Sequence, residues 1–281
     1  MRRHATSLAA AALALGLGLG LTACGSGSGS GSGADGGDSG ALVVGATAVP
    51  AGEVLDFIKK DLAGKEGLDL EVKEFTDYVL PNTALQEGQL DANLYQNVPF
   101  LENFNKTKGT DLVSVAEAYL PPMGVYSKKL DDLAALQAGA TVAVPNETTN
   151  EGRALHLLAS KGLIELKEGA GVTASPADIT SNPKRIRFKE LEPAQLPRVL
   201  DDVDAAVINS NYALDAGLSP KKDAVLLESV DGNEYTNVLA VKKGDEDDPR
   251  VEKLVKLLHS PEVRQFIQDK YQGSVLPVAA H

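Results

Sequence analysis

The chain has 281 residues, which is enough for one large domain or for two of about 100–130 residues each. Its formal net charge is −12, and it has no basic run outside the amino terminus. This pattern argues against a nucleic-acid-binding protein, because phosphate groups are bound by clustered Lys and Arg.

Residues 1–23 have the pattern of an export signal. Arg2 and Arg3 give a positive start, and the stretch ATSLAAAALALGLGLGLTA that follows is apolar, small and uncharged. Such a segment is removed from the mature protein. An uncleaved membrane anchor is the alternative, because the apolar run is nearly long enough to span a bilayer.

Cys24 is the only cysteine of the chain and directly follows this segment. The sequence LTAC resembles a bacterial lipobox, with Leu21 three positions before the cysteine and small residues between them. The resemblance implies that residues 1–23 are a lipoprotein signal peptide and that Cys24 carries a diacylglyceryl group. Two acyl chains give lasting anchorage, so we expect a protein anchored by lipid to the extracytoplasmic face of the cell membrane. A domain without further cysteines uses no disulfides.

Residues 24–40 continue from the cysteine as GSGSGSGSGADGGDSG. Gly/Ser-rich chains are flexible coils, and a stretch of this length reaches roughly 20–25 Å from end to end. We therefore expect a tether that holds the following domain above the membrane.

From Ala41 the sequence alternates between strand and helix patterns. ALVVGATA is a short buried-strand pattern, AGEVLDFIKKDLAGKEG has apolar residues at helical spacing, and LDLEVKEF alternates strictly, as a strand does. This β–α–β order predicts a parallel sheet with helices on its faces.

Two segments far apart in the chain share one order of elements. TALQEGQLDANLYQNVPFLENF and AQLPRVLDDVDAAVINSNYALDAG both read as a helix, a turn, a short strand and a polar loop leading into another helix. The strands end in side chains able to hydrogen-bond, namely Tyr95, Gln96, Asn97, Asn209, Asn211 and Tyr212. Ligands of open α/β sheets bind beyond the carboxyl ends of strands, so two such edges facing each other would form a cleft. The order of strands and helices that α/β folds have in common could also produce this similarity.

The remaining patterns predict a chain that crosses twice between two halves. MGVYSKKLDDLAAL reads as an apolar crossing strand, a turn and a new helix from Leu130. NVLAVKKG reads as a returning strand, followed by a charged helical pair split near Pro261.

These crossings define two expected lobes. Lobe 1 comprises residues 41–127 and 224–281, and lobe 2 comprises residues 128–223. We expect the hinge between them near Tyr126 and Ala224.

Several motifs in this order resemble those of the NlpA/methionine-binding lipoproteins, the substrate-binding components of methionine ABC importers. The motifs are FTDYVLPNTAL, GQLDANLYQNVPFL, GVYSKK, VAVPNETTNEGRAL, ELEPAQLPRVLDDVDAAVINSNYA and YTNVLAVKKG. The resemblance covers about Ala41 to Val278. It implies an α/β fold of the two-lobed periplasmic-binding-protein type, in which each lobe is a mostly parallel sheet flanked by helices and the ligand cleft lies between the lobes.

The resemblance also implies a function. We expect a monomeric lipoprotein that captures L- or D-methionine and delivers it to the permease and ATPase of an ABC importer, with no cofactor, metal or nucleic acid. The same role for another apolar amino acid or a small dipeptide is the alternative.

Arg153 is the candidate for holding the carboxylate of such a ligand. It follows a polar loop at the start of a predicted helix, where Asn150 or Thr149 can cap the helix and Thr148 with Glu151 fits a capping box. Unpaired N–H groups and the helix dipole favour an anion there, and a guanidinium grips a carboxylate with two parallel bonds. A solvated surface arginine is the alternative.

The other candidate ligand-binding residues are amides and aromatics. The resemblance assigns the ligand's ammonium to Asn209 and Asn237, although asparagines in loops are most often turn formers. Aromatic rings attract a thioether, and the candidates for an apolar slot are Tyr78, Tyr95, Phe100 and Tyr119. Asn97 and Asn150 complete the predicted site. Asn97 stands where many relatives have histidine, and the chain lacks tryptophan, departures that bear on the ligand's identity rather than on its class.

An enzyme is the rival interpretation. His156 falls in an apolar helix, where packing is expected, and His259 falls in a charged helix. The sequence has no free thiol nucleophile, HExxH or CxxC motif, so we expect no catalytic residue. An adhesion or sensor lipoprotein is a further alternative, in which Arg153 would tolerate alanine.

Overall fold

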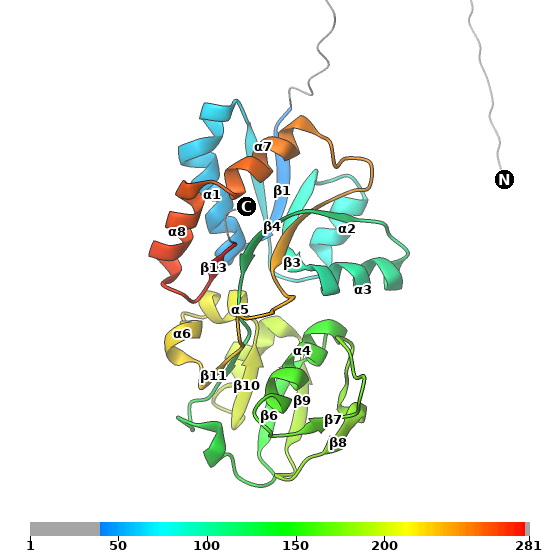
Figure 1. Ribbon diagram of the computed structural model, residues 1–281, viewed down its shortest axis with the longest axis vertical. Helices are drawn as coiled ribbons and strands as arrows, with labels where there is room; N and C mark the ends of the chain where they lie inside the picture. The colour runs from blue at the N-terminus through cyan, green and yellow to red at the C-terminus, as the bar shows by residue number, and fades with distance from the viewer. Residues whose placement is uncertain (1–39, 279–281) are drawn as a thin grey trace, which may run out of the picture. The chain divides into compact units, whose positions relative to one another are not determined.

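The computed structural model describes residues 40–278, so the predicted signal peptide, Cys24 and most of the tether lie outside the described residues. Residues 40–278 form a sheet of six strands and a sheet of five strands, each flanked by helices (Figure 1). A two-stranded ribbon of β7 (Glu165–Leu166) and β8 (Ile179–Ser181) accompanies the second sheet. The predicted two-lobed α/β fold is confirmed.

The six-stranded sheet has the order β13-β4-β12-β3-β1-β2. Its strands are β1 (Leu42–Thr47), β2 (Leu70–Phe75), β3 (Ala92–Asn97), β4 (Val113–Leu120), β12 (Asn237–Val241) and β13 (Leu276–Pro277). β1 pairs in parallel with β2 and β3, as the β–α–β pattern predicts. β12 returns from the other lobe and pairs antiparallel with both β3 and β4, so this sheet is mixed.

Helices cover both faces of this sheet. They are the helical region 48–66, whose α-helical part is α1 (Glu53–Phe57), with α2 (Leu80–Gln86), α3 (Val98–Lys108), α7 (Pro249–Leu258) and α8 (Pro261–Tyr271). The rest of the region 48–66 consists of two π-helical turns, η1 (Ala48–Gly52) and η2 (Ile58–Leu62), and the 3-10 turn η3 (Ala63–Glu66). One core joins α1, α7 and α8 to β1, and a second joins α2 and α3 to β3 (Figure 1). The predicted break of the last helical pair at Pro261 is confirmed, since Pro261 opens α8.

The five-stranded sheet has the order β11-β5-β10-β6-β9. Its strands are β5 (Gly124–Tyr126), β6 (Thr141–Pro145), β9 (Arg187–Leu191), β10 (Ala205–Ile208) and β11 (Leu226–Leu227). The helices of this lobe are α4 (Thr148–Ala159), α5 (Ser210–Asp215) and α6 (Pro220–Asp223). Residues of β6 alternate between the core under α4, which takes Val142 and Val144, and the core beside α5, which takes Ala143.

Two predicted helices are shorter than the sequence pattern suggests. The helix predicted from Leu130 is only a 3-10 turn, η4 (Leu133–Ala135), because Gly139 has a positive φ and β6 begins two residues later. The helical pattern before β10 is the 3-10 helix η6 (Pro193–Val199). Pro197 lies inside it, and proline cannot donate the bond that an α-helix needs.

The sheet to which each strand belongs indicates where the chain crosses between the lobes. After β4 the chain passes Pro121 and Pro122, which have no N–H to continue the ladder, before β5 opens at Gly124. The predicted segments 41–127 and 224–281 of lobe 1 therefore include β5 and β11, which pair in the other sheet. The lobe boundaries stay a proposal, and we place the two crossings at 121–123 and 228–236.

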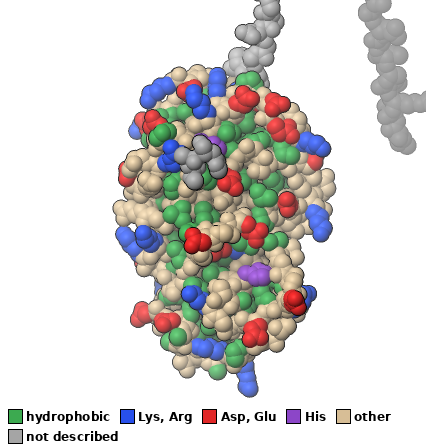
Figure 2. Space-filling model, in the orientation of Figure 1, with side chains coloured by type: hydrophobic (Ala, Val, Ile, Leu, Met, Phe, Trp, Pro, Cys, Tyr) green, Lys and Arg blue, Asp and Glu red, His purple; other side chains and the backbone are tan. Residues whose placement is uncertain are grey.

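The described surface gives two further facts. In Figure 2, basic and acidic side chains are interspersed over the visible face. Among residues 40–278, no helix combines the length and the apolar character that crossing a bilayer requires.

Gly152 lets α4 approach the loop at residues 172–174 closely. A Cβ atom at this position would lie 2.8 Å from the carbonyl carbon of Val172 and 2.9 Å from the backbone nitrogen of Ala174. Backbone atoms cannot swing aside as a flexible side chain can, so α4 or the loop would have to move.

We expect Gly152→Ala to lower the free energy of unfolding by about 1–3 kcal/mol, because overpacking outweighs the better helix propensity of alanine. Urea denaturation measures the change. Gly64→Ala is the matched control, since nothing lies within 4 Å of its Cβ position. Equal stability of Gly152→Ala and the wild type would contradict the steric argument.

Candidate ligand-binding site

A cavity lies between the carboxyl end of β3 in one lobe and the starts of α4 and α5 in the other. It contains about 400 Å³ of space between atoms, with open solvent at its mouth included. Its lining residues are Pro50, Tyr78, Tyr95, Gln96, Asn97, Phe100, Pro121, Asn150, Arg153, Asn209, Ser210, Asn211 and Asn237. Eight of the nine predicted ligand-binding residues are therefore brought together, and Tyr119 is the exception.

The sheet topology explains why these residues meet. Asn97 ends β3 and Asn209 follows β10, so both lie at carboxyl ends of strands. Asn237 begins β12, which runs antiparallel to β3 and places Asn237 opposite Asn97. An antiparallel strand thus contributes its first residue at the edge where a parallel strand contributes its last.

Arg153 is a buried residue with an internal partner. Its side chain is only 3% exposed, which rules out the solvated-surface alternative. Nε and Nη2 donate to the two carboxylate oxygens of Glu228 at 2.9 and 2.6 Å, and Nη2 also donates to the carbonyl oxygen of Pro121 at 3.1 Å. The guanidinium carbon lies 4.2 Å from the ring centre of Tyr235. The remaining nitrogen, Nη1, has no hydrogen-bond partner among residues 40–278.

Glu228 balances this buried positive charge. Burial raises the pKa of its carboxyl, but the Arg153 charge and the hydrogen bonds from Arg153, Asn233 and the Met123 amide outweigh that effect and leave the pKa lowered. The Met123 N–H donates at 3.1 Å, so Glu228 joins the start of one crossing to the end of the other. A buried pair of this kind is held by its geometry, because either charge alone would be costly.

The start of α4 differs from the prediction. The N-cap is Glu147, whose carboxylate accepts the backbone N–H groups of Thr149 and Asn150, each at 3.0 Å. The predicted caps at Asn150 or Thr149 and the predicted box of Thr148 with Glu151 are wrong, because the longer glutamate side chain folds back over the first turn. The N–H groups predicted to favour a ligand's carboxylate thus bind the protein's own carboxylate.

Glu151, one turn further along α4, is a buried carboxyl. Burial, followed by the negative charges of Glu190 and Glu147, raises its pKa to about 7. Its Oε1 atom is buried and lacks a hydrogen-bond partner among the described residues. Glu151 does not line the cavity.

Asn209 lines the cavity and carries an unused acceptor. Its Nδ2 donates to Oδ1 of Asn150 at 2.7 Å, and Nδ2 of Asn150 donates to Glu147 at 2.6 Å. Asn209 is 7% exposed, and its Oδ1 has no partner within the described part of the chain. A buried oxygen without a donor costs free energy unless a ligand supplies one.

Tyr119 lies behind the site rather than in it. This tyrosine is fully buried on β4, where it faces Asn237 across the β12–β4 pairing. Nδ2 of Asn237 lies 3.4 Å from its hydroxyl oxygen, so Tyr119 orients Asn237 instead of contacting the cavity. The register of two antiparallel strands decides this, and the sequence did not reveal it.

Three aromatic side chains form one apolar wall. The rings of Tyr78, Tyr95 and Phe100 lie 5.9–6.0 Å apart, and Phe100 meets both tyrosines edge to face. Burial raises the pKa of both tyrosines well above its ordinary value, so their hydroxyls stay neutral.

Tyr78 also reaches across to the other lobe. Its hydroxyl donates to Oδ1 of Asn211 at 2.6 Å, and its ring centre lies 5.1 Å from that of Tyr212. Tyr212 in turn donates to the carbonyl oxygen of Thr76 at 3.0 Å. The two lobes are thus held together beside the cavity.

The remaining cavity amides have structural partners. Asn97 is the N-cap of α3 and accepts the N–H of Phe100 at 3.0 Å. Gln96 belongs to a buried amide network with Asn82 and Asn93, in which every bond is 2.7–2.9 Å long. This network fixes the end of β3 on which the aromatic wall depends.

A family model described as NlpA lipoprotein matches residues 42–279 of the chain. The chain belongs to the NlpA lipoprotein family. The D-methionine-binding lipoprotein MetQ of Escherichia coli K12 is 41% identical, and the match covers 84% of this chain and 86% of MetQ. The membrane lipoprotein TpN32 of Treponema pallidum is 39% identical over 82% of this chain and 85% of its own.

Solved structures of similar proteins include a complex with methionine. The nutrient-binding protein of Burkholderia cenocepacia bound to methionine is 49% identical, with a TM-score of 0.82, and the match covers 85% of this chain and all of that chain. Such identity and coverage extend the family assignment over both lobes of this NlpA lipoprotein.

The sequence analysis missed several residues that support the cavity. Glu228 and Tyr235 lie in the returning crossing, far along the chain from Arg153, and no local pattern links them. Glu147 lies in the polar loop directly before α4. The preference of acidic side chains for helix amino termini is the signal that could have identified it as the N-cap.

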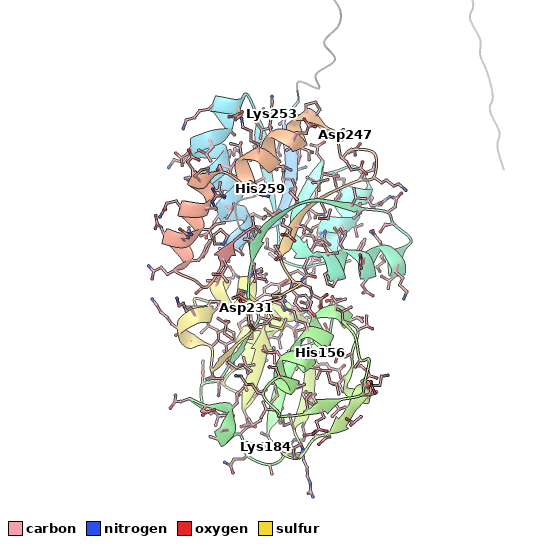
Figure 3. All side chains as sticks on the ribbon, in the orientation of Figure 1. His156, Lys184, Asp231, Asp247, Lys253 and His259 are labelled. Carbon is pink, nitrogen blue, oxygen red and sulfur yellow. The ribbon has the colours of Figure 1, made fainter. Side chains whose placement is uncertain are left out.

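The two histidines among the described residues lie away from the cavity and in different lobes (Figure 3). His156 is exposed rather than packed as expected, and its Nε2 lies 3.1 Å from the carbonyl oxygen of Gly171. Nε2 of His259 lies 2.7 Å from the carbonyl oxygen of Glu117. Neither faces a nucleophile in the cavity.

Proposed function

We propose that this NlpA-family lipoprotein captures methionine between its two lobes and delivers it to the permease and ATPase of an ABC importer. The observation that carries the proposal is one buried cavity with a guanidinium, an unused amide acceptor and an aromatic wall. A free amino acid needs these three features, because a dry site must satisfy a carboxylate, an ammonium and a side chain.

The ligand's carboxylate binds at Arg153 in this proposal. Nη1 has no partner among residues 40–278, and charge-assisted hydrogen bonds contribute roughly 1.5–3 kcal/mol each. Glu228 already neutralises the guanidinium. The cavity therefore suits a ligand with no net charge, such as an amino acid zwitterion, better than an anion.

The ammonium binds against Asn209 and Asn237. Oδ1 of Asn209 lacks a donor in the described structure, and an ammonium supplies three. Asn237 faces the same cavity from β12, with Tyr119 behind it. Asn150 contributes by holding Asn209 rather than by offering a free atom of its own.

The thioether packs against Tyr78, Tyr95 and Phe100. A sulfur atom near an aromatic ring gains about 0.3–1.5 kcal/mol, which distinguishes methionine modestly from an aliphatic side chain. The methionine named for the Burkholderia and Escherichia relatives favours this ligand. Another apolar amino acid or a small dipeptide is the alternative.

Capture couples to rotation of the lobes about the crossings at 121–123 and 228–236. Contacts from Tyr78 and Tyr212 to the opposite lobe hold the closed arrangement. The protein acts as a monomer on its lipid anchor at Cys24, which lies outside the described residues, and presents the closed form to the importer.

Calorimetry with a panel of ligands tests the proposal. We expect L-methionine, D-methionine or both to bind more tightly than leucine, isoleucine, valine, phenylalanine and alanyl-alanine. Tighter binding of another apolar amino acid or the dipeptide would support the alternative ligand. No binding of any panel member at millimolar concentration would overturn the proposed function.

Removing the guanidinium should weaken methionine binding by about 2 kcal/mol or more, roughly thirtyfold, because the buried carboxylate loses its partner. Arg153→Ala alone would leave Glu228 buried and unpaired, at a cost of about 3–5 kcal/mol to folding. The test therefore uses Arg153→Ala combined with Glu228→Gln.

Glu228→Gln alone is the matched control. It leaves the buried guanidinium without its counter-charge and should lower stability, but it should still bind methionine because it keeps the guanidinium. Calorimetry on both variants, with thermal unfolding as a check of folding, gives the comparison. Equal affinity of the single and double variants would show that Arg153 does not hold the carboxylate.

A further inference from the structure

Glu147, Asn150 and Asn209 form a chain of hydrogen bonds that leads from α4 to the cavity, and we call it the amide relay. Glu147 lies outside the cavity lining, whereas Asn150 and Asn209 belong to it. Asn150 is 4% exposed and Asn209 is 7% exposed, so a bond lost within the relay would leave a buried polar group in need of a partner.

The relay has a direction, and Glu147 sets it. An ionised carboxylate accepts hydrogen bonds and cannot donate any. The Glu147 carboxylate accepts the backbone N–H groups of Thr149 and Asn150, the Thr149 hydroxyl and Nδ2 of Asn150, the last at 2.6 Å. Asn150 can therefore face Glu147 only with its Nδ2 group.

This constraint passes to the next amide. With Nδ2 turned to Glu147, Asn150 presents Oδ1 to Asn209. Nδ2 of Asn209 donates to this oxygen at 2.7 Å. Oδ1 of Asn209 is then the atom left over, and it has no partner among the described residues. A flip of either asparagine would set like groups face to face and leave buried polar atoms unsatisfied.

We infer that Glu147 is a positioning residue that makes the cavity select ligands bearing an ammonium group. It acts through Asn150 by forcing Asn209 to present an acceptor where the ligand's α-substituent lies. An ammonium donates to that acceptor, whereas the carbonyl oxygen of an α-keto acid would oppose it. The inference rests on the proposed function, since it names how that site distinguishes amino acids from their deaminated analogues.

Glu147→Gln in the full chain is the direct test. A glutamine can turn its own NH₂ group toward Asn150, which lets both asparagines flip and present a donor to the cavity instead. Calorimetry with L-methionine and with its α-keto acid analogue gives two affinities for each protein. We expect the wild type to prefer methionine and Glu147→Gln to reduce the ratio of the two affinities at least tenfold.

Two further variants separate this effect from helix capping and from charge. Glu147→Ser keeps a favoured N-cap residue but offers no carboxylate to Asn150, so it should also reduce the ratio and remain folded. Glu151→Gln removes a neighbouring carboxyl on the same helix that lies outside the cavity lining and makes no bond to Asn150. Glu151→Gln should leave the ratio unchanged.

The outcomes distinguish the inference from the proposed function. A wild type that binds neither ligand overturns the proposed function and the inference with it. A wild type that prefers methionine, with folded Glu147→Gln and Glu147→Ser variants that keep the same preference, overturns the inference alone. An equal loss of preference in Glu151→Gln would also overturn it, because charge rather than the relay would then set the selectivity.

Discussion

The buried ion pair of Arg153 with Glu228 is the interaction on which the rest of this protein's site depends. It joins α4 of one lobe to both crossings: Arg153 donates to Pro121 in the first crossing and to Glu228 at the start of the second, and Glu228 accepts the Met123 N–H of the first. A buried guanidinium would be too costly alone, and the glutamate makes its burial tolerable without occupying all its donors. The cavity can therefore offer a positive group to a ligand and remain neutral overall.

Two polar groups of the cavity are each backed by a glutamate. Glu228 stands behind the guanidinium proposed to bind the carboxylate, and Glu147 stands behind the amides proposed to bind the ammonium. Neither glutamate lines the cavity. Glu228 balances the charge of its neighbour and Glu147 orients the amides beside it, while the aromatic wall supplies apolar contact. In the proposed function, recognition depends on residues that touch the ligand and equally on the charged residues behind them.

The sequence was sufficient for the fold and for most of the cavity wall. Periodicity gave the β–α–β start, and hydrogen-bonding side chains after two strands marked the edges that meet at the cavity. It was insufficient where long-range register decides, as for Tyr119 behind Asn237, or where the partner lies far along the chain, as for Glu228. The predicted helices near Leu130 and Pro197 were too long, because a turn glycine and an internal proline override the apolar spacing that suggested an α-helix.

A crystal structure of the protein grown with L-methionine tests the central claim most directly. The account predicts electron density for one amino acid between the lobes, with its carboxylate within hydrogen-bonding distance of the Arg153 guanidinium and its ammonium against Oδ1 of Asn209. A ligand bound in the opposite orientation, or a guanidinium that contacts only Glu228 and Pro121 while methionine binds elsewhere, would contradict it.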